Sequence, residues 1–532
     1  MSFTLAVTAL GLSAVAGALP HARTQKTIEW NSCPELNENI TLQVGNIPIL
    51  PFECGSLTVP LDYTEPDSDP LDLAVFRVKA TKEPVLGSVM FNPGGPGGTG
   101  GLDFNSAATD LRANVGEQWD LVSWDPRGTG NTIPFNCPLE GLDGSAPAAK
   151  RDVGTLASGN LTEGFLNGGW EYAGAIADSC FSTANETGEL IGTVFAVRDM
   201  MNIVDALCED GLLRYYGWSY GTALGSYAAA LFPDRVERMV LDGNIDPVAY
   251  QSGTWGDWVD DIDEVFWTFL ESCFDNKEEC ALAQFVNANS TQDMLDVINL
   301  ALEPLAENAT TSIEAYVNLI TVKSPLIRPL YFPAQWPAFA EAIVALLNPT
   351  EAPEEPAADA TPAVEPYDQA VNALLGIRGS DAIFRPETAE EYLPTVEYQA
   401  NVSKSFSDVQ YISIWASARW KMDAKERYFG DFNKTTKTPI LYVNGNYDPV
   451  TPISDARSAS AGFKGSVVLE HNGLGHGIFA DPSTCVQKHV QQYFLDGTLP
   501  DPDTVCEPDL GPWELAAARN GSILGALELT SS

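Results

Sequence analysis

The sequence predicts an α/β fold in which helices cover a mostly parallel central sheet. Short segments rich in β-branched and apolar residues alternate with helical patterns along the chain, which is typical of parallel strands connected by helices. A glycine-flanked turn also joins one of these strands to a small, alanine-rich helix. Apolar residues make up 45% of the 532 residues, which is enough for a large core and excludes global disorder.

The expected elements follow one another in a regular order. We expect strands at residues 71–80, 88–91, 119–124, 213–218, 238–241, 439–443 and, as the last one, 466–470. Helical spacing predicts helices at residues 195–207, 220–231 and 485–494.

A helical insertion of nearly 200 residues separates two of the expected strands, those at 238–241 and 439–443. One set of apolar residues recurs at steps of three and four, which predicts an amphipathic helix: Trp255, Trp258, Ile262, Phe266 and Phe269. We interpret the insertion as a lid or cap, with this stripe in its core. A second packing domain is the alternative.

The chain is expected to divide at these changes of pattern. The expected parts are a signal peptide (1–18), the first part of the core (19–245), the cap (246–404), the second part of the core (405–510) and a tail (511–532). Within the cap, residues 349–366 contain five prolines, five alanines and five acidic residues. No core can form from this composition, so we expect a flexible surface loop.

The charge balance is strongly acidic and excludes several classes of partner. There are 72 acidic residues against 29 lysines and arginines, a net charge of −43. Such a surface repels phosphate backbones and anionic membranes, so nucleic-acid and membrane partners are not expected. A large net charge also favours solubility.

The amino terminus and the sequons indicate export. Residues 5–19 are all apolar or small and contain Ala16-Gly17-Ala18, which predicts a signal peptide cleaved near Ala18 rather than a buried helix. No later apolar run is long enough to span a membrane. N-glycosylation sequons occur at Asn39, Asn160, Asn185, Asn289, Asn308, Asn401, Asn433 and Asn520. We therefore expect a soluble, secreted and N-glycosylated protein.

The nine cysteines lack the repeated Cys-x-x-Cys spacing of metal sites and suit a disulfide framework. The predicted bridges join neighbours in the sequence: Cys33–Cys54, Cys137–Cys180, Cys273–Cys280 and Cys485–Cys506. Cys208 is expected to remain unpaired.

The glycine-flanked turn carries the first candidate catalytic residue. Residues 217–221 read G-W-S-Y-G and match the G-x-S-x-G nucleophile elbow. The motif alone is weak in a chain with 44 glycines. Its place between the strand at 213–218 and the helix at 220–231 supplies the required strand–turn–helix context. Ser219 is therefore the predicted nucleophile.

A serine nucleophile needs a histidine base, and the chain has four histidines. His21 lies beside the signal boundary, and His489 lies in a helical stretch. His476 follows the strand at 466–470 in a glycine-flanked loop that could reach the serine, and it is the predicted base. His471, at the end of that strand, is the alternative.

The acid that orients this histidine is expected at the carboxyl end of an earlier strand. Asp448 follows the strand at 439–443, and Asp242 follows the strand at 238–241 as the rival. With Asp448, the chain order is Ser219, Asp448, His476, which is the order in α/β-hydrolases.

A glycine-rich segment supplies candidate donors for an oxyanion. Residues 92–98 read N-P-G-G-P-G-G directly after the strand at 88–91. The amides of Gly95 and of Tyr220, the residue after the nucleophile, are the expected pair. The segment lacks G-x-G-x-x-G and contains two prolines, so a dinucleotide site is not expected; a plain structural turn is the alternative.

Together these motifs resemble one family of α/β-hydrolases. They are residues 92–98, the D-P-R-G-T-G turn at 125–130, residues 217–222, the L-D-G segment at 241–243 and the segments around Asp448 and His476. They are similar to the prolyl-iminopeptidase and tripeptidyl-aminopeptidase branch, including its TAP-like carboxyl-terminal segment. The resemblance implies a serine exopeptidase that acts on a free amino terminus beneath a helical cap. It gives Ser219, Asp448, His476, Gly95 and Tyr220 the roles derived above, and it implies a structural role for Arg127.

The expected function is a secreted serine hydrolase, an aminopeptidase that releases amino-terminal residues or short peptides through an acyl-enzyme. The alternative is an esterase or lactonase that acts on small secreted metabolites, because one scaffold supports many acyl-transfer reactions. A non-catalytic binding module is disfavoured, because the sequence contains the nucleophile, the acid and the base: Ser219, Asp448 and His476. The substrate is a peptide or a small acyl compound, and neither cofactor nor metal is expected. In the family, acidic cap residues hold the substrate amine; Asp260, Asp261, Asp263 and Glu264 are possible here, although a solvated helix face explains them equally well.

Overall fold

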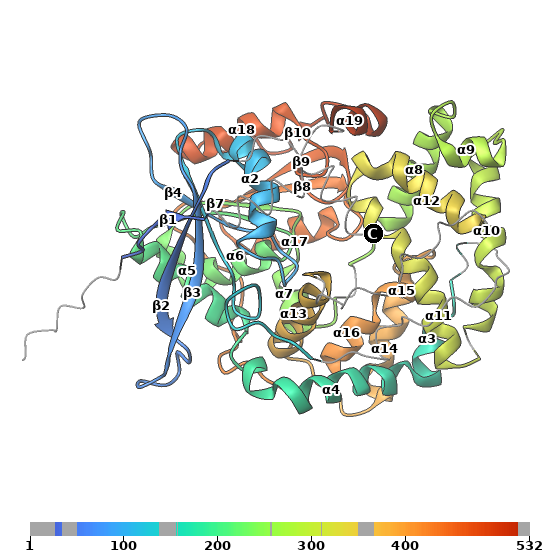
Figure 1. The fold of residues 1–532 in the computed structure, drawn as a ribbon, viewed down its shortest axis with the longest axis horizontal. Coiled ribbons are helices and arrows are strands. Elements are labelled where there is room, and N and C mark those ends of the chain that lie inside the picture. Colours follow the sequence, from blue (N-terminus) through green and yellow to red (C-terminus); the bar gives the residue numbers. More distant parts are fainter. Residues whose placement is uncertain are drawn as a thin grey trace, which may run out of the picture.

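The computed structural model has one ten-stranded sheet at its centre (Figure 1). The structure describes residues 27–33, 50–137, 156, 158–255, 258–309, 311–348 and 366–519. The strands are β1 Asn31–Ser32, β2 Phe52–Pro60, β3 Pro70–Val78, β4 Ser88–Asn92, β5 Asp120–Trp124, β6 Leu213–Trp218, β7 Val236–Asp242, β8 Leu441–Tyr447, β9 Val467–Leu474 and β10 Val505–Cys506.

The sheet is mostly parallel, as predicted. Its strand order is β1-β2-β3-β5-β4-β6-β7-β8-β9-β10. All pairs from β5 to β10 are parallel, whereas β1, β2 and β3 are joined by antiparallel pairing. Strands β1, β2 and β10 were not predicted, and β9 is therefore not the last strand. The sequence gives little signal for β1 and β10 because each has only two residues.

Two layers of helices cover the sheet (Figure 1). They are α2 Leu102–Val115 and α18 Thr484–Asp496 on one face, and α5 Thr193–Ala206, α6 Tyr220–Leu231 and α17 Ile453–Gly462 on the other. Alternate residues of one strand face different layers: Tyr216 packs with the first group and Tyr215 with the second. The helices predicted at 195–207, 220–231 and 485–494 are confirmed to within two residues.

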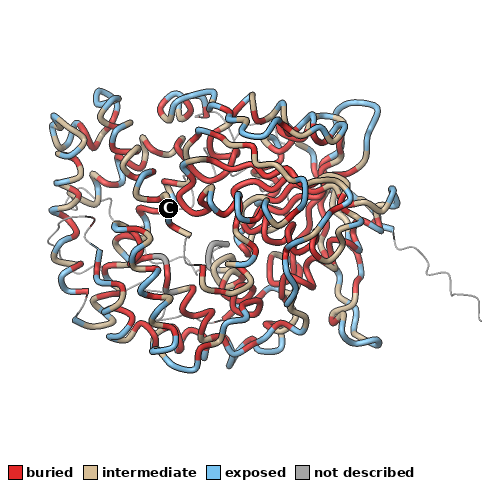
Figure 2. Tube along the Cα trace, turned by 180° about the vertical axis from the view of Figure 1, so that it is seen from behind, coloured by how far each residue is buried: buried red, intermediate tan, exposed pale blue. Residues whose placement is uncertain are grey.

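The segment between β7 and β8 is helical, and most of its helices gather at one side of the sheet (Figure 1). It contains α7 Pro247–Ser252, α8 Ile262–Asp275, α9 Ala281–Val286, α10 Thr291–Asn308, α11 Ile313–Lys323, α12 Trp336–Leu347, α13 Pro366–Asp381, α14 Ala389–Gln399, α15 Ser407–Gln410 and α16 Ile412–Ala418. Two earlier helices, α3 Leu161–Gly164 and α4 Trp170–Gly188, pack against this group: the ring of Phe165, between them, lies 5.1 Å from Trp415. In Figure 2 buried residues are concentrated along the sheet, whereas buried and exposed residues alternate along the outer helices.

The amphipathic helix predicted from Trp255 to Phe269 is shorter than expected. Helix α8 begins at Ile262, so Trp255 and Trp258 precede it. The acidic residues Asp261 and Asp263 lie at its amino terminus, where negative charge is favoured and where aspartate is better tolerated than inside a helix. The remainder of the stripe forms core as predicted, with the Phe269 ring 4.7 Å from that of Phe339.

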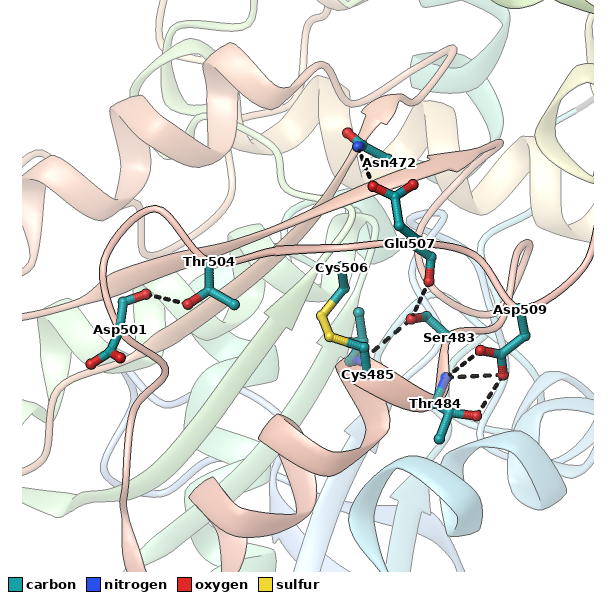
Figure 3. Close-up of a disulfide and its surroundings, with 10 residues drawn as sticks. Asn472, Ser483, Thr484, Cys485, Asp501, Thr504, Cys506, Glu507 and Asp509 are labelled. Atoms are coloured by element: carbon teal, nitrogen blue, oxygen red, sulfur yellow. Dashed lines mark hydrogen bonds between the residues drawn. A yellow bond between two sulfur atoms is a disulfide. The ribbon is translucent and has the colours of Figure 1, made fainter.

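All four predicted disulfides are present, and Cys208 is unpaired and exposed. The Cys485–Cys506 bridge ties α18 to β10 (Figure 3). Beside it, Asn472 of β9 donates a hydrogen bond to Glu507, and Ser483 donates to the Glu507 carbonyl (Figure 3). These contacts fix the strand from which the His476 loop leaves.

Several sequence predictions fall outside the described residues: the signal peptide, the sequons at Asn39 and Asn520, and the loop at 349–365. No single described helix is long and apolar enough to cross a membrane, although the bent pair Ile313–Tyr331 and Pro333–Leu347 together meets that length and composition.

Candidate active site

Ser219 lies at a strained turn between β6 and α6. Its backbone has φ +56° and ψ −124°, a conformation that is costly for a residue with a side chain. The two glycines of the motif are required by close packing. A Cβ on Gly217 would lie 2.4 Å from the Gly221 carbonyl oxygen, and one on Gly221 would lie 2.7 Å from the Asn92 carbonyl oxygen. The turn thus has the geometry of a nucleophile elbow.

Asp448 and His476 meet after β8 and β9. Oδ2 of Asp448 lies 2.9 Å from His476 Nδ1. Asp448 is fully buried and also accepts hydrogen bonds from the amides of Val450, Thr451 and Gly477. The many donors compensate for burying this carboxylate and fix its orientation toward the imidazole.

Thr451 is a member of this group that the sequence did not reveal. Its hydroxyl donates to Asp448 Oδ2 at 2.7 Å and lies 3.1 Å from His476 Nδ1. It therefore shares the carboxylate with the imidazole. The signal in the sequence is its place three residues after Asp448, at the start of the turn into α17.

Two contacts bring the histidine loop onto the serine turn. The indole of Trp218, directly before Ser219, donates to the His476 carbonyl at 3.3 Å, and its ring packs against the imidazole at 5.4 Å. From the helical segment between β7 and β8, the Tyr331 carbonyl accepts the His476 amide at 2.8 Å, and the Tyr331 ring contacts the imidazole at 5.3 Å. The sequence suggested neither aromatic residue as part of the site.

Asp242, the rival acid, has a different position. Its carboxylate accepts from the Tyr216 hydroxyl at 2.8 Å and from the Ile478 amide, and its carbonyl accepts the Ser219 amide at 3.0 Å. Burial raises the pKa of Asp242 to about 7. Asp242 thus stabilises the serine turn and the histidine loop through these hydrogen bonds. The described contacts of the imidazole Nδ1 are with Asp448 and Thr451.

The two other histidines in the described part of the chain do not reach this arrangement. His471 lies within β9, is buried, and has its pKa lowered to about 4 by burial. His489 lies on α18, and His21 is outside the described residues.

The glycine-rich loop adjoins the serine turn. A Cβ on Gly94 would lie 2.7 Å from Ser219 Cβ and 3.2 Å from the Tyr220 amide nitrogen. Among the described residues, no group accepts the amide hydrogen of Gly95 or of Tyr220. Both amides are therefore available as donors; that of Tyr220 directly follows Ser219, and that of Gly95 follows the glycine that packs against it.

Arg127 has the structural surroundings expected of it. It is completely buried, forms an ion pair with Asp199 at 2.7 Å, and donates to the carbonyl of Pro60. It ties the D-P-R-G-T-G turn to α5 and to the end of β2.

The acidic residues at the start of α8 differ in their surroundings. The Asp263 carboxylate accepts hydrogen bonds from the Ser403 hydroxyl and from the amides of Lys404 and Ser405. Asp261 has one carboxylate oxygen buried without a hydrogen-bond partner. Burial, followed by the charges of Asp260 and Asp448, raises the pKa of Asp261 to about 7. Its electrostatic interaction with Asp448 indicates that the two carboxylates lie in the same region.

Comparisons with known proteins agree with this geometry. Residues 87–315 match the family model described as alpha/beta hydrolase fold, and residues 403–506 match the one described as TAP-like protein. The chain has the α/β-hydrolase fold.

Relatives of this α/β-hydrolase include named peptidases. The tripeptidyl aminopeptidase of Streptomyces lividans is 27% identical, over 93% of this chain and 89% of its own length. Serine protease Hip1 of Mycobacterium tuberculosis (strain ATCC 25618 / H37Rv) is 25% identical, over 90% and 91%. Carboxylesterase B of M. tuberculosis (strain CDC 1551) is also 25% identical, over 90% of each chain. The chain is a serine hydrolase of the peptidase type, and it is similar to the tripeptidyl aminopeptidases.

Proposed function

We propose that this hydrolase is a secreted aminopeptidase in which Ser219, His476 and Asp448 form the catalytic triad. The observation that carries the assignment is the buried Asp448–His476 pair, held by contacts with Trp218 against the strained turn of Ser219. Asp448 orients the imidazole through Nδ1 and stabilises its positive charge.

In the proposed reaction, Ser219 Oγ attacks the carbonyl carbon of the scissile peptide bond while His476 Nε2 accepts the hydroxyl proton. The amides of Gly95 and Tyr220 donate to the oxyanion of the tetrahedral intermediate, an interaction worth about 3–4 kcal/mol per donor in comparable enzymes. His476 then protonates the leaving amine, and the C–N bond breaks. Water, activated by His476, hydrolyses the acyl-enzyme and restores Ser219.

Asp261 is the residue we propose to hold the free amino terminus of the substrate. Its unpartnered oxygen would accept from an ammonium group, and the ammonium would favour the ionised carboxylate that burial disfavours. Neighbouring Asp263 is occupied by hydrogen bonds and does not need such a partner.

Secretion and N-glycosylation belong to the same proposal. Six sequon asparagines lie among the described residues, and all six are exposed: Asn160, Asn185, Asn289, Asn308, Asn401 and Asn433. The four disulfides suit an oxidising compartment. Expression in a eukaryotic secretory host followed by glycosidase digestion tests this part: a mobility shift supports it, and an unchanged mass contradicts it.

A substrate panel tests the proposed activity. Matched peptides with a free or an acetylated amino terminus should differ strongly in kcat/KM, with the free amine preferred. Asp261→Asn should raise KM for the free-amine peptide and leave a small acyl ester unaffected, whereas Asp263→Asn serves as the matched control. Cleavage of esters alone would instead support the esterase alternative.

A further inference from the structure

Arg378 is a buried cation without an anionic partner in the described part of the chain. It lies on α13, with 5% of its surface exposed, and its Nε and Nη1 groups have no hydrogen-bond partner. The buried cations Arg127 and Lys323 are both paired, with Asp199 and Asp408, each at 2.7 Å. Burial lowers the pKa of Arg378 only to about 10, so the guanidinium remains charged at neutral pH.

Aromatic rings hold the Arg378 guanidinium in place. Its central carbon lies 4.0 Å from the ring centroid of Trp255 and 4.5 Å from that of Trp258. These contacts with aromatic faces stabilise the cation, but they supply no acceptor for its Nε and Nη1 donors. The same two indoles line a small pocket together with Ile245, Ala249, Val450 and Asp455.

The surroundings of Arg378 connect it with the catalytic residues. Its charge interacts with Tyr331, whose ring contacts the His476 imidazole at 5.3 Å. The same helix passes over the glycine-rich loop, because a Cβ on Gly97 would lie 2.6 Å from the Ala370 carbonyl oxygen. Arg378 therefore lies on a helix that adjoins the glycine-rich loop, and its charge interacts with a residue that contacts His476.

An unpaired buried guanidinium is costly unless a ligand completes its hydrogen bonds. Its N–H donors suit a carboxylate oxygen, which accepts charge-assisted hydrogen bonds from a guanidinium. We propose that Arg378 forms an anion-binding subsite that takes a carboxylate of the substrate. The proposal rests on the peptidase function proposed above. The carboxylate has two possible sources, the carboxyl terminus of a short peptide or an acidic side chain near the scissile bond.

Two pairs of free-amine peptides distinguish these sources. One pair differs only in a free or an amidated carboxyl terminus, and the other only in Glu or Gln beside the scissile bond. The wild-type enzyme should prefer the anionic member of one pair. In Arg378→Met the ratio of kcat/KM between the members should fall roughly 10- to 100-fold, the range expected for hydrogen bonds to a charged group.

Two further variants control for loss of charge and of stacking. Arg378→Lys keeps the charge but not the planar donors, and should retain part of the preference. Arg419→Met removes a comparable contact, because Arg419 lies 4.5 Å over Trp170 on α4, and it should keep the full preference. Circular dichroism checks that each variant is folded. If Arg378→Met does not fold, the Arg378→Lys result decides.

The failures of the two proposals are distinguishable. If the wild type cleaves no peptide, the peptidase proposal fails, and the subsite is then read from fluorophosphonate labelling of Ser219. Glutarate should slow this labelling in the wild type but not in Arg378→Met. An unchanged peptide ratio in folded Arg378→Met, or equal protection of both proteins by glutarate, would overturn the anion subsite.

Discussion

The hydroxyl of Thr451 lies 3.1 Å from Nδ1 of His476, and both groups meet at the same oxygen of Asp448. Oδ2 of Asp448 lies 2.7 Å from the Thr451 hydroxyl oxygen and 2.9 Å from His476 Nδ1. The hydroxyl therefore helps to fix the carboxylate that orients the imidazole. Four further contacts, from three amides and the Trp218 indole, fix the carboxylate and the histidine loop.

Removal of the Thr451 hydroxyl should impair catalysis without unfolding the protein. We expect Thr451→Val to lower kcat roughly 10- to 100-fold, because a hydrogen bond to a charged group contributes about 1.5–3 kcal/mol. Thr451→Ser keeps the donor and should restore most of the activity. A kcat against pH profile distinguishes positioning from simple loss of stability: the profile should shift in Thr451→Val and remain in place in Thr451→Ser.

The two candidate acids should differ strongly in their effect on catalysis. Asp448→Asn should lower kcat about 10⁴-fold, as in comparable triads, because it favours the wrong imidazole tautomer. Asp242→Asn should lower it less than about tenfold, because it alters ordinary hydrogen bonds to Tyr216 and Ile478. Single-turnover kinetics on one peptide compares them, and a larger loss in Asp242→Asn would reassign the acid.

Folding stability should increase as the pH falls from 8 to 6. Burial raises the pKa of Asp242 and Asp261 to about 7 and that of Asp381 to about 6, from an ordinary value of 3.8. The folded state therefore binds more protons than the unfolded state between pH 3.8 and about 7. The stability that this proton binding contributes is lost as the pH rises through that window. Each pKa unit corresponds to about 1.4 kcal/mol.

His471 makes the folding stability change in the opposite direction at lower pH. Its pKa is lowered to about 4, so its contribution is lost as the pH falls from 6.5 toward 4. Thermal melts across pH 4–8 measure the sum, and Asp242→Asn should flatten the upper part of the curve. A melting temperature that rises steadily from pH 6 to pH 8 would contradict this account.

The disulfide between Cys485 and Cys506 should support the catalytic loop. It anchors β10, which pairs with β9. Asn472 of β9, four residues before His476, donates a hydrogen bond to Glu507, directly after β10. We expect the double variant Cys485→Ser/Cys506→Ser to lose about 2–4 kcal/mol of unfolding free energy. Cys208→Ser is the matched control and should change stability little, because Cys208 is exposed and unpaired.

The sequence predicted the parts of the site that depend on local motifs and chain order. Ser219 follows from a strand–turn–helix motif, and Asp448 and His476 follow from their places after strands of a parallel sheet. Thr451 was within reach of the same reasoning, since it lies three residues after Asp448. No motif marked it, because threonine in a turn is common.

The residues that escaped prediction depend on contacts between distant segments. Tyr331 contacts His476 from the helical segment between β7 and β8, and Arg378 contacts Trp255 across more than a hundred residues of sequence. Similarly, Asp261 and Asp263 are alike in sequence, and only tertiary contacts with Ser403 and its neighbours separate their roles. The short strands β1 and β10 exist because a neighbouring strand pairs with them.

The most direct measurement of the central claim is labelling of the purified protein with a fluorophosphonate probe, followed by peptide mapping. A single modified serine, Ser219, is expected in the wild type, and a folded Ser219→Ala variant should lose both labelling and peptide hydrolysis. Undiminished labelling of Ser219→Ala, or modification of another serine, would contradict it.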